Sequence, residues 1–284
     1  MAEVLQEIGE MLAEAGIEPG ADAELLLGHV LGESRGGVQA LAFMGRAISG
    51  EDREAALDLA SERARRVPLQ HLTGKAPFRG FELEVGPGVF VPRPETETVA
   101  QLAIDALAAV PSAEPIAVDL CTGSGTLALA LAQEVPTARV WAVEKSPEAH
   151  AWAGRNIARL GCGRVELLLG DAADALELLE PLRGRVHVLV SNPPYVPLGM
   201  VPRDPEVRDH DPDLALFGGP DGLDLVRVIS RVGLDLVVGG GALVLEHAEG
   251  QGAAIRALLA ADGWRAASTH RDLTLRDRAT TAVR

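Results

Sequence analysis

The stretch Ile116–Thr126 (IAVDLCTGSGT) decides the architecture that this chain can adopt. Four apolar residues and one acid form a short buried strand, and the loop after it carries glycines at positions 123 and 125. Glycine lets the backbone turn tightly and approach a ligand closely, because no Cβ stands in the way. Apolar residues resume directly after the loop. This order of strand, glycine loop and helix predicts the first unit of a parallel sheet, with a ligand beyond the carboxyl end of the strand.

Downstream of this stretch, strand and helix patterns keep alternating, which is typical of an α/β sheet with helices on both faces. The expected strands are 116–120, 139–144, 165–170, 186–191, 242–247, about 264–270 and 279–283. The expected helices are 125–133, 147–160, 221–238 and 250–262. The sequence therefore predicts a seven-stranded, Rossmann-like α/β domain.

The first 66 residues have a different, helical pattern and contain no catalytic constellation. Apolar residues at helical spacing predict helices over 1–15, 21–31 and 53–66, with a break at Gly16 and Pro19-Gly20. Turn residues at Arg79-Gly80 and at 86–88 then predict a β-hairpin. We expect a helical substrate-recognition domain over residues 1–74, a hairpin linker over 75–92 and the α/β domain over 93–284.

Composition narrows the classes of partner. The formal net charge is −15, and a protein that grips nucleic acid through its phosphates normally presents a basic face. No apolar run reaches the roughly 18 residues that span a membrane, and the acidic N-terminus does not resemble a signal peptide. Cys121 and Cys162 are expected to be reduced thiols, and the histidines lack the spacing of metal ligands. We expect a cytoplasmic protein without metal, membrane or nucleic-acid partners.

Acidic residues close three successive predicted strands. Asp119 ends the first, Glu144 ends the second 25 residues later, and Asp171 follows the third. An acid at the position of Glu144 can bind a ribose diol, and Asp171 can accept a hydrogen bond from an adenine amino group. Position 128 is Ala, so the full Gly-x-Gly-x-x-Gly spacing is absent, and there is no phosphate loop. A nicotinamide cofactor is therefore less favoured than S-adenosylmethionine, which carries no phosphates.

The fourth predicted strand ends in Ser191-Asn192-Pro193-Pro194-Tyr195. A residue before proline is driven to extended backbone, so Asn192 should project beyond the strand end. The Asn192 side-chain oxygen and the Pro193 carbonyl make a pair of acceptors suited to a planar –NH2 group. Tyr195 offers a ring that can pack on such a group. The alternative is a strand-ending turn with a tyrosine in the core.

These motifs together resemble the protein-glutamine methyltransferases that use S-adenosylmethionine. The segment 91–97 (VPRPETE) narrows the resemblance to the release factor glutamine methyltransferases, and Gly218–Asp224 and Gly239–Glu246 also match. The resemblance covers about residues 68–284. It implies methyl transfer to the Gln of the Gly-Gly-Gln loop in class I peptide-chain release factors, with S-adenosylhomocysteine as the product.

The resemblance also implies the site residues. Cofactor-binding residues would be Asp119, Cys121, Thr122, Gly123, Ser124, Gly125, Glu144, Asp171, Ala172 and Asn192. Asn192, Pro193 and Tyr195 would act in catalysis, and the substrate would contact Arg93, Glu95, Glu97 and Asn192–Tyr195. Arg93, Glu95 and Glu97 have an alternative role in structural salt bridges.

The chain departs from the family pattern at a few positions. Glu144 stands where Asp is usual, His71 where Tyr is common, and Ala172 lacks the larger side chain of some relatives. Two other enzymes remain alternatives, a glutamine methyltransferase of a ribosomal protein and a DNA adenine amino-methyltransferase. The second shares the Asn-Pro-Pro-Tyr tetrapeptide but needs a basic groove and a base-flipping pocket.

Overall fold

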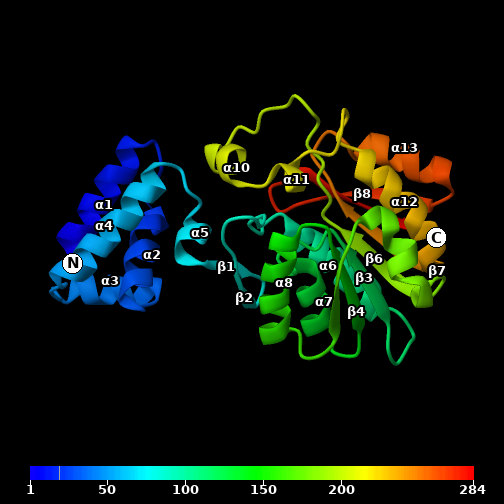
Figure 1. Cartoon of the computed structure of the whole chain (residues 1–284), viewed down its shortest axis with the longest axis horizontal. Coiled ribbons are helices and arrows are strands. Elements are labelled where there is room, and N and C mark those ends of the chain that lie inside the picture. Colours follow the sequence, from blue (N-terminus) through cyan, green and yellow to red (C-terminus); the bar gives the residue numbers. More distant parts are fainter. Residues whose placement is uncertain (19) are drawn as a thin grey trace. The chain divides into compact units, whose positions relative to one another are not determined.

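A computed structural model of the chain describes residues 1–18 and 20–284, so Pro19 of the expected helix break lies outside the described residues. The chain divides into two compact units (Figure 1). Unit 1 consists of Met1–Lys75 and Pro202–His210, and unit 2 of Ala76–Val201 and Asp211–Arg284. A short piece of chain that follows the Asn-Pro-Pro-Tyr motif therefore belongs to the helical unit.

Unit 1 is built from helices around its own apolar core. They are α1 (Ala2–Glu14), α2 (Gly20–Leu31), α3 (Arg35–Phe43), α4 (Gly50–Ala64), α5 (Leu69–Thr73) and α10 (Pro205–His210). Helix α1 buries Val4, Ile8 and Leu12, which are four residues apart and so form one stripe. Helix α3 was not expected, because Arg35-Gly36-Gly37 has low helix propensity. Its N-cap Ser34, which accepts a hydrogen bond from the Gly37 amide, and the buried Val38 offset that cost.

Ion pairs bind α10 to the other helices of unit 1. Glu206 accepts hydrogen bonds from Arg63 and Arg66, each at 2.8 Å, and Arg63 also pairs with Asp22 at 2.8 Å. The Arg63 side chain is only 10% exposed, so these contacts are screened less than pairs on the open surface.

Unit 2 begins with a hairpin and continues as the α/β domain. Its elements are β1 (Lys75–Phe78), β2 (Phe81–Glu84), α6 (Thr96–Ala108), β3 (Ile116–Leu120), α7 (Thr126–Glu134), β4 (Arg139–Glu144), α8 (Pro147–Leu160), β5 (Val165–Leu169), η1 (Ala172–Asp174), α9 (Ala175–Leu178), η2 (Glu180–Leu182), β6 (Val186–Ser191), α11 (Asp213–Leu216), α12 (Asp224–Leu236), β7 (Val237–Glu246), α13 (Gly252–Asp262), β8 (Arg265–Arg271) and β9 (Asp277–Val283). Lys75, the first residue of β1, falls in unit 1.

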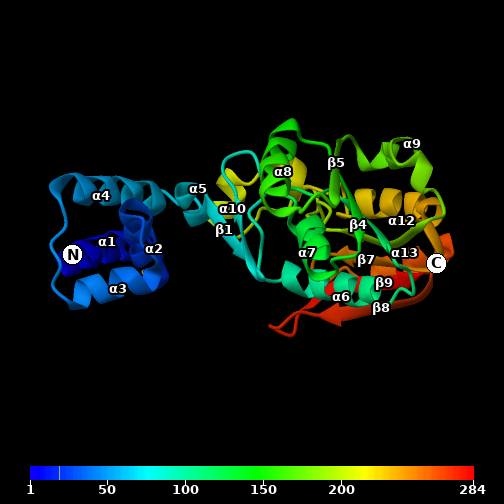
Figure 2. The same cartoon turned by 90° about the horizontal axis from the view of Figure 1, so that it is seen from below.

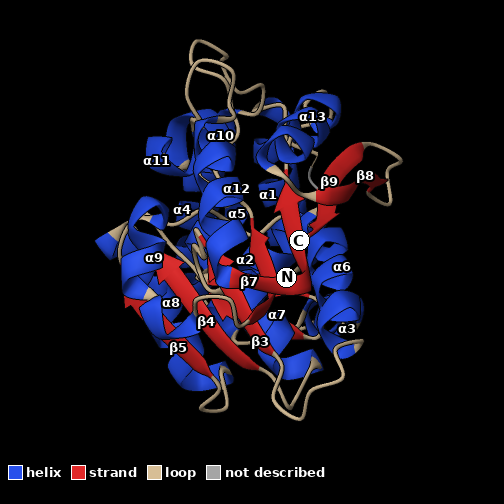
Figure 3. Cartoon of the chain, turned by 90° about the vertical axis from the view of Figure 1, so that its right-hand side faces the viewer, coloured by secondary structure: helices blue, strands red, loops and turns tan. Residues whose placement is uncertain are grey.

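The large sheet has the strand order β5-β4-β3-β6-β7-β9-β8 (Figure 3). The five strands from β5 to β7 are parallel, and β9 is antiparallel to both of its neighbours. The predicted seven-stranded α/β domain with a helical domain before it is confirmed. Strand β9 departs from the parallel pattern of the other strands, because a short connection from β8 turns the chain straight back beside it.

Successive strand residues face opposite sides of the sheet and create two apolar layers. Ala117 and Val188 pack with α6, α7 and α8 on one face, where the hairpin residues Phe78 and Leu83 join them. Val118 and Leu189 pack with α9, α12 and α13 on the other face. Figure 2 shows the hairpin strand β1 near α8, on the same side of the sheet as α7. Both faces are thus covered, and the strand ends are left for function.

In the described parts of the chain, 1–18 and 20–284, no helix is both long and apolar enough to cross a membrane.

Candidate active site

The register of the sheet brings the two sequence motifs side by side. Strands β3 and β6 are neighbours, and Leu120 pairs with Ser191 at their carboxyl ends. The Ser191 hydroxyl also donates to the Leu120 carbonyl at 2.6 Å. Strand order reverses between β3 and β6, which is where α/β sheets bind their ligands. The glycine loop and the Asn-Pro-Pro-Tyr turn therefore start from adjacent points of one edge.

The neighbouring strands extend this edge in both directions. Glu144 at the end of β4 pairs with Leu169 of β5, and Leu245 of β7 pairs with Ser191. Glu144 ends β4 on one side of the two motifs, and Glu246 ends β7 on the other side. Paired strands lie about 4.8 Å apart. The edge thus carries acidic or amide side chains at the ends of β4, β6 and β7.

Asp119 is hydrogen-bonded both to the glycine loop and to α7. It is fully buried, and its Oδ2 accepts hydrogen bonds from the Thr122 hydroxyl (2.5 Å) and the Ala128 amide (3.1 Å). Burial raises the pKa of Asp119 to about 7, against the opposing effect of these two donors. Its Oδ1 is buried and has no hydrogen-bond partner among the residues that the structure describes. Asp119 therefore braces the loop against α7 and keeps one oxygen free.

The loop itself leaves room for a ligand on one side and is tight on the other. Gly123 and Gly125 have φ of 58° and 89°, in the left-handed region that favours glycine. A Cβ on Gly123 would meet nothing within 4 Å, whereas one on Gly125 would touch Leu129 at 3.5 Å. Gly123 thus exposes its backbone, whereas Gly125 is required by its left-handed φ.

The remaining loop residues are held in place by the protein. The Ser124 and Thr126 hydroxyls are 2.8 Å apart, and Asn156 of α8 donates to the Ser124 carbonyl at 3.0 Å. Asn156 also bonds to both backbone groups of Glu84, so it ties the loop to the hairpin. Sequence reasoning missed Asn156, because nothing in the α8 pattern marks it. Burial raises the pKa of Cys121, so this thiol stays protonated and unreactive.

Glu144 is bound to the backbone around it. Its Oε2 accepts the Gly123 amide and its Oε1 accepts the Ser146 amide, both at 2.8 Å. Burial raises the pKa of Glu144, and these amides oppose that shift. A carboxylate oxygen has two lone pairs, so each oxygen keeps one acceptor position. The carboxylate is pre-oriented by its own loop and can still bind a diol.

Asp171 has two protein partners. It caps η1 by accepting the Ala173 amide at 2.9 Å, and it pairs with Lys145 at 2.7 Å. The Ala173 amide and then Lys145 lower the pKa of Asp171. Ala172 beside it is buried. Asp171 is thus a fixed carboxylate at the far side of the glycine loop from β6.

The Asn-Pro-Pro-Tyr turn contrasts with these acids. Asn192 is partly exposed. Within residues 1–18 and 20–284, neither its side-chain amide nor the Pro193 carbonyl takes part in a hydrogen bond. The predicted pair of acceptors is therefore free to receive a ligand.

A second loop, residues 218–222 between α11 and α12, fixes the backbone of the Asn-Pro-Pro-Tyr turn. A Cβ on Gly218 would lie 2.3 Å from the Pro194 carbonyl oxygen, and one on Gly222 would lie 2.1 Å from that of Tyr195. The Gly218 amide donates to the Val196 carbonyl at 2.9 Å. Gln251 donates to the Tyr195 carbonyl at 2.9 Å. The sequence marked Gly218–Asp224 as a family segment without a role, and its role is to hold the turn.

The Tyr195 phenol lies against a buried carboxyl that sequence reasoning missed. Its hydroxyl is 3.5 Å from Oε1 of Glu246, the last residue of β7. Glu246 is 1% exposed, and within the described part of the chain its Oε2 has no hydrogen-bond partner. Its position in the sequence could have identified it as a site residue, because Glu246 ends the strand next to β6.

The Arg93–Glu97 segment divides between two places. Arg93 pairs with Asp211 at 2.7 Å and lies over the Phe90 ring at 5.0 Å. Glu95 is partly buried and acts electrostatically on Tyr195. Glu97 instead accepts the Arg79 amide at 2.9 Å.

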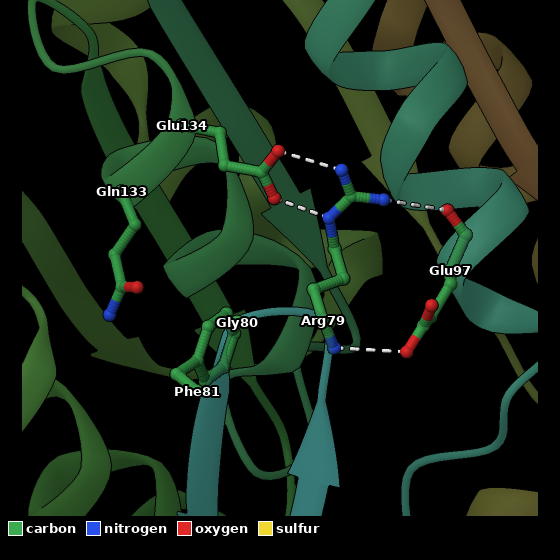
Figure 4. Close-up of a pocket in the computed structure, with 6 residues that line it drawn as sticks. All are labelled: Arg79, Gly80, Phe81, Glu97, Gln133 and Glu134. Atoms are coloured by element: carbon green, nitrogen blue, oxygen red, sulfur yellow. Dashed lines mark hydrogen bonds and ion pairs between the residues drawn. The ribbon is translucent and has the colours of Figure 1, made fainter.

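Figure 4 shows the surroundings of Glu97. The Arg79 guanidinium points between Glu134, with which it forms an ion pair, and the Glu97 backbone carbonyl, while Gln133 and Phe81 point away. Glu97 thus anchors the turn of the hairpin to the start of α6.

The residues present fit a nucleoside-type cofactor that lacks phosphates. Open space at Gly123, free acceptor positions on Glu144 and the unpartnered Asp119 Oδ1 all lie around one loop. In the described residues, no group of three or more His, Cys, Asp or Glu is arranged to hold a metal ion.

Comparison with known proteins places this chain. Residues 3–74 match the family model "PrmC N-terminal domain", and residues 117–195 match "Methyltransferase domain". A release factor glutamine methyltransferase of Streptomyces coelicolor is 47% identical, over 99% of this chain and 97% of that protein.

Two further relatives are informative. A 4-amino-L-phenylalanine/4-methylamino-L-phenylalanine methyltransferase of Streptomyces pristinaespiralis is 38% identical, over 100% of this chain and 95% of that protein. A solved SAM-dependent methyltransferase from Agrobacterium tumefaciens is similar in fold, with a TM-score of 0.50, 14% identity, and coverage of 73% of this chain and 68% of that one.

The match to the Streptomyces coelicolor protein covers nearly the whole chain and therefore spans both units. This chain belongs to the release factor glutamine methyltransferase family.

Proposed function

We propose that this protein transfers a methyl group from S-adenosylmethionine to the side-chain amide nitrogen of the Gln in the Gly-Gly-Gln loop of class I release factors. The observation that carries the proposal is the pair of unengaged acceptors at Asn192 and Pro193, one strand away from the glycine loop. The reaction would leave S-adenosylhomocysteine and would take place in the cytoplasm, where translation ends.

The cofactor would be held along the edge formed by β3, β4 and β5. Glu144 would accept from the ribose hydroxyls, and Asp171 and Ala172 would border the adenine. The loop Asp119–Gly125 would contact the remainder, with Gly123 giving backbone access. S-adenosylmethionine supplies an electrophilic methyl group when bound.

The Asn-Pro-Pro-Tyr turn would supply position and electrostatics. A carboxamide nitrogen is a weak nucleophile because its lone pair is delocalised into the carbonyl. If Asn192 Oδ1 and the Pro193 carbonyl each accept one N–H, the nitrogen is aimed and the positive charge that develops on it is stabilised. Tyr195 would pack on the amide plane. The methylated cation is strongly acidic, so no general base is needed.

The residues before α6 would border the substrate. We infer that Arg93 and Glu95 order the chain beside Tyr195 and contact the Gly-Gly backbone. Glu97 contributes through the hairpin, since its carboxylate is bound to the Arg79 amide.

The helical residues 1–74 would grip the release factor, and residues 93–284 would perform the chemistry. Support comes from the Glu206 ion pairs, which hold a segment downstream of Tyr195 within the helical unit. The helices that would bind the factor are therefore connected, through the backbone of residues 196–201, to the turn that would receive its Gln.

Three other substrates remain as test cases. Adenine in DNA and a ribosomal-protein glutamine also present a planar –NH2 group, and the name of one relative specifies an aromatic amine. The net charge of −15 disfavours DNA. A release factor is favoured because the Streptomyces coelicolor release factor enzyme is 47% identical to this chain, against 38% for the aromatic-amine enzyme.

The deciding experiment uses labelled S-adenosylmethionine and purified full-length protein. A folded class I release factor should be labelled, only at its Gly-Gly-Gln glutamine, and a factor with that Gln changed to Glu should not be. A short Gly-Gly-Gln peptide should react far more slowly, because ordering it costs entropy. Label on 4-amino-L-phenylalanine, a ribosomal protein or duplex DNA, with none on the release factor, would overturn the assignment.

A further inference from the structure

One buried acid at the sheet edge that carries the candidate active site has no role in the reaction described above. Glu246 ends β7, next to the strand that carries Asn192, and only 1% of it is exposed. Removing a carboxyl group from water is costly unless it is fully hydrogen-bonded. Glu246 is not fully hydrogen-bonded, because no described residue makes a hydrogen bond to its Oε2. A carboxyl that served only packing would be replaced by an apolar side chain at a gain in stability.

The groups around Glu246 come from four elements of unit 2. Tyr195, after β6, has its hydroxyl 3.5 Å from Oε1, and the Thr96 hydroxyl of α6 lies beside the carboxyl. Arg278 of β9 attracts its charge, and Glu95 before α6 repels it. Arg278 is held in turn by Asp272 at 3.4 Å. The residue after β7, His247, is buried, and its Nε2 is hydrogen-bonded to the Thr280 hydroxyl at 2.8 Å.

The Tyr195 phenol is a donor at all relevant pH values, because burial and then the charge of Glu246 raise its pKa. Glu246 itself changes state near neutrality. Burial raises the pKa of Glu246 to about 7, while Thr96 and Arg278 oppose the shift. Only the ionised carboxylate is a strong, charge-assisted acceptor for the phenol.

We propose that Glu246 is a positioning residue for methyl transfer, whose carboxylate accepts a hydrogen bond from Tyr195 and so fixes the ring that packs on the substrate amide. The proposal rests on the proposed function for the identity of that amide. The 3.5 Å separation is longer than the roughly 2.7 Å of a full O–H···O bond. It shortens when substrate packs on the ring, as catalytic hydrogen bonds do on complex formation.

Tyr195 is the single tyrosine of the chain, which allows a test without any substrate. In protein labelled with 13C at the tyrosine Cζ, one resonance should move with a midpoint near pH 7 as Glu246 ionises. The resonance should stay still in Glu246→Gln, which keeps the shape but cannot titrate. Glu166→Gln, at an exposed position of β5, is the matched control and should titrate like the wild type. A wild-type resonance that does not move, or one that still moves in Glu246→Gln, overturns the proposal.

Kinetics then test whether the contact matters for the reaction. At saturating substrates, the ratio of wild-type to Glu246→Gln kcat should rise from about one at pH 6 to roughly three- to tenfold at pH 8, with little change in KM. Tyr195→Phe should lose about tenfold, and adding Glu246→Gln to it should cost nothing more. Multiplying effects, or a ratio independent of pH, would overturn the proposal. A wild type that is inert on release factors would contradict the proposed function instead, and the resonance experiment would still decide the role of Glu246.

Discussion

The sheet edge that carries the candidate active site has two halves. They differ in how far their polar side chains are already bound by other groups of the protein. At the ends of β4 and β5, the acidic side chains are bound by the protein's own groups, Glu144 by two backbone amides and Asp171 by Lys145. At the ends of β6 and β7, neither the Asn192 side-chain amide nor Glu246 Oε2 forms a hydrogen bond with any residue in the described ranges 1–18 and 20–284. The first half is pre-formed for a small ligand, whereas the second keeps polar capacity for a group supplied by another molecule.

The difference follows from what each half must bind. A small cofactor of constant structure is bound best by a rigid, pre-oriented cradle, since less entropy is lost on binding. A side chain presented by a protein partner needs acceptors that are held in place but not yet used. In the second half the rigidity resides in the backbone, through Gly218, Gly222 and Gln251, and the open capacity resides in the side chains.

The largest expected effect is at Asn192. Asn192→Ala should lower the methylation rate by roughly 10²- to 10³-fold, as expected on removal of one charge-stabilising group. Its affinity for S-adenosylmethionine, measured by calorimetry, should stay within about tenfold of the wild type. Turnover close to the wild type would show that the second half does not act through this amide.

On the cofactor half, Glu144→Ala should weaken S-adenosylmethionine binding by about 1.5–3 kcal/mol, the range for hydrogen bonds to a charged group. The rate at saturating cofactor should fall much less. Because Glu144 also orients Gly123, Glu144→Gln, which keeps one acceptor, should fall between the two. Unchanged affinity in calorimetry would mean that Glu144 is only a brace for the loop.

A steric substitution tests whether the loop of residues 218–222 holds the Asn-Pro-Pro-Tyr turn in position. Gly218→Ala places a methyl group against the Pro194 carbonyl without a left-handed φ, so it should shift the turn and lower kcat about tenfold. Gly239→Ala, where a Cβ meets nothing within 4 Å, is the matched control and should be neutral. Equal kcat values for the two variants would show that the turn keeps its position without this loop.

The smallest expected effect is on stability. The pKa of Glu246 is about 7 in the folded protein, above its ordinary value of 4.5. Between these values the folded state binds more protons than the unfolded state, so the wild type loses stability as pH rises. Glu246→Gln avoids this loss, so its stability relative to the wild type should increase by at least about 1 kcal/mol as pH rises from 5 to 8.

Urea unfolding at the two pH values measures this difference. Asp119, whose pKa is also about 7, titrates in both proteins and cancels from the comparison. A relative stability of Glu246→Gln that does not increase between the two pH values would show that the carboxylate is a structural ion and not one kept at a cost in stability.

Much of unit 2 could be predicted from local pattern, because its strands are short apolar runs with clear turn signals. Residues 116–120, 139–144, 147–160 and 186–191 have their expected bounds. Helix α12 begins at Asp224 and not at residue 221, because Gly222, with φ of 76°, belongs to the loop that grips Tyr195. Strand β7 begins at Val237, five residues early, because it pairs with Val186 before a bulge in that pairing. These differences arise from contacts distant in sequence.

The sequence alone determined the order of the elements, the glycine loop, the Asn-Pro-Pro-Tyr turn and the acids that close the strands, since these are local signals of backbone geometry and residue type. Only the tertiary structure decided which side chains share a neighbourhood. It paired Leu120 with Ser191, brought the Gly218–Gly222 loop onto the turn and set Glu246 against Tyr195. Strand register and loop packing depend on burial summed over the whole sheet, and no window of local sequence contains that sum.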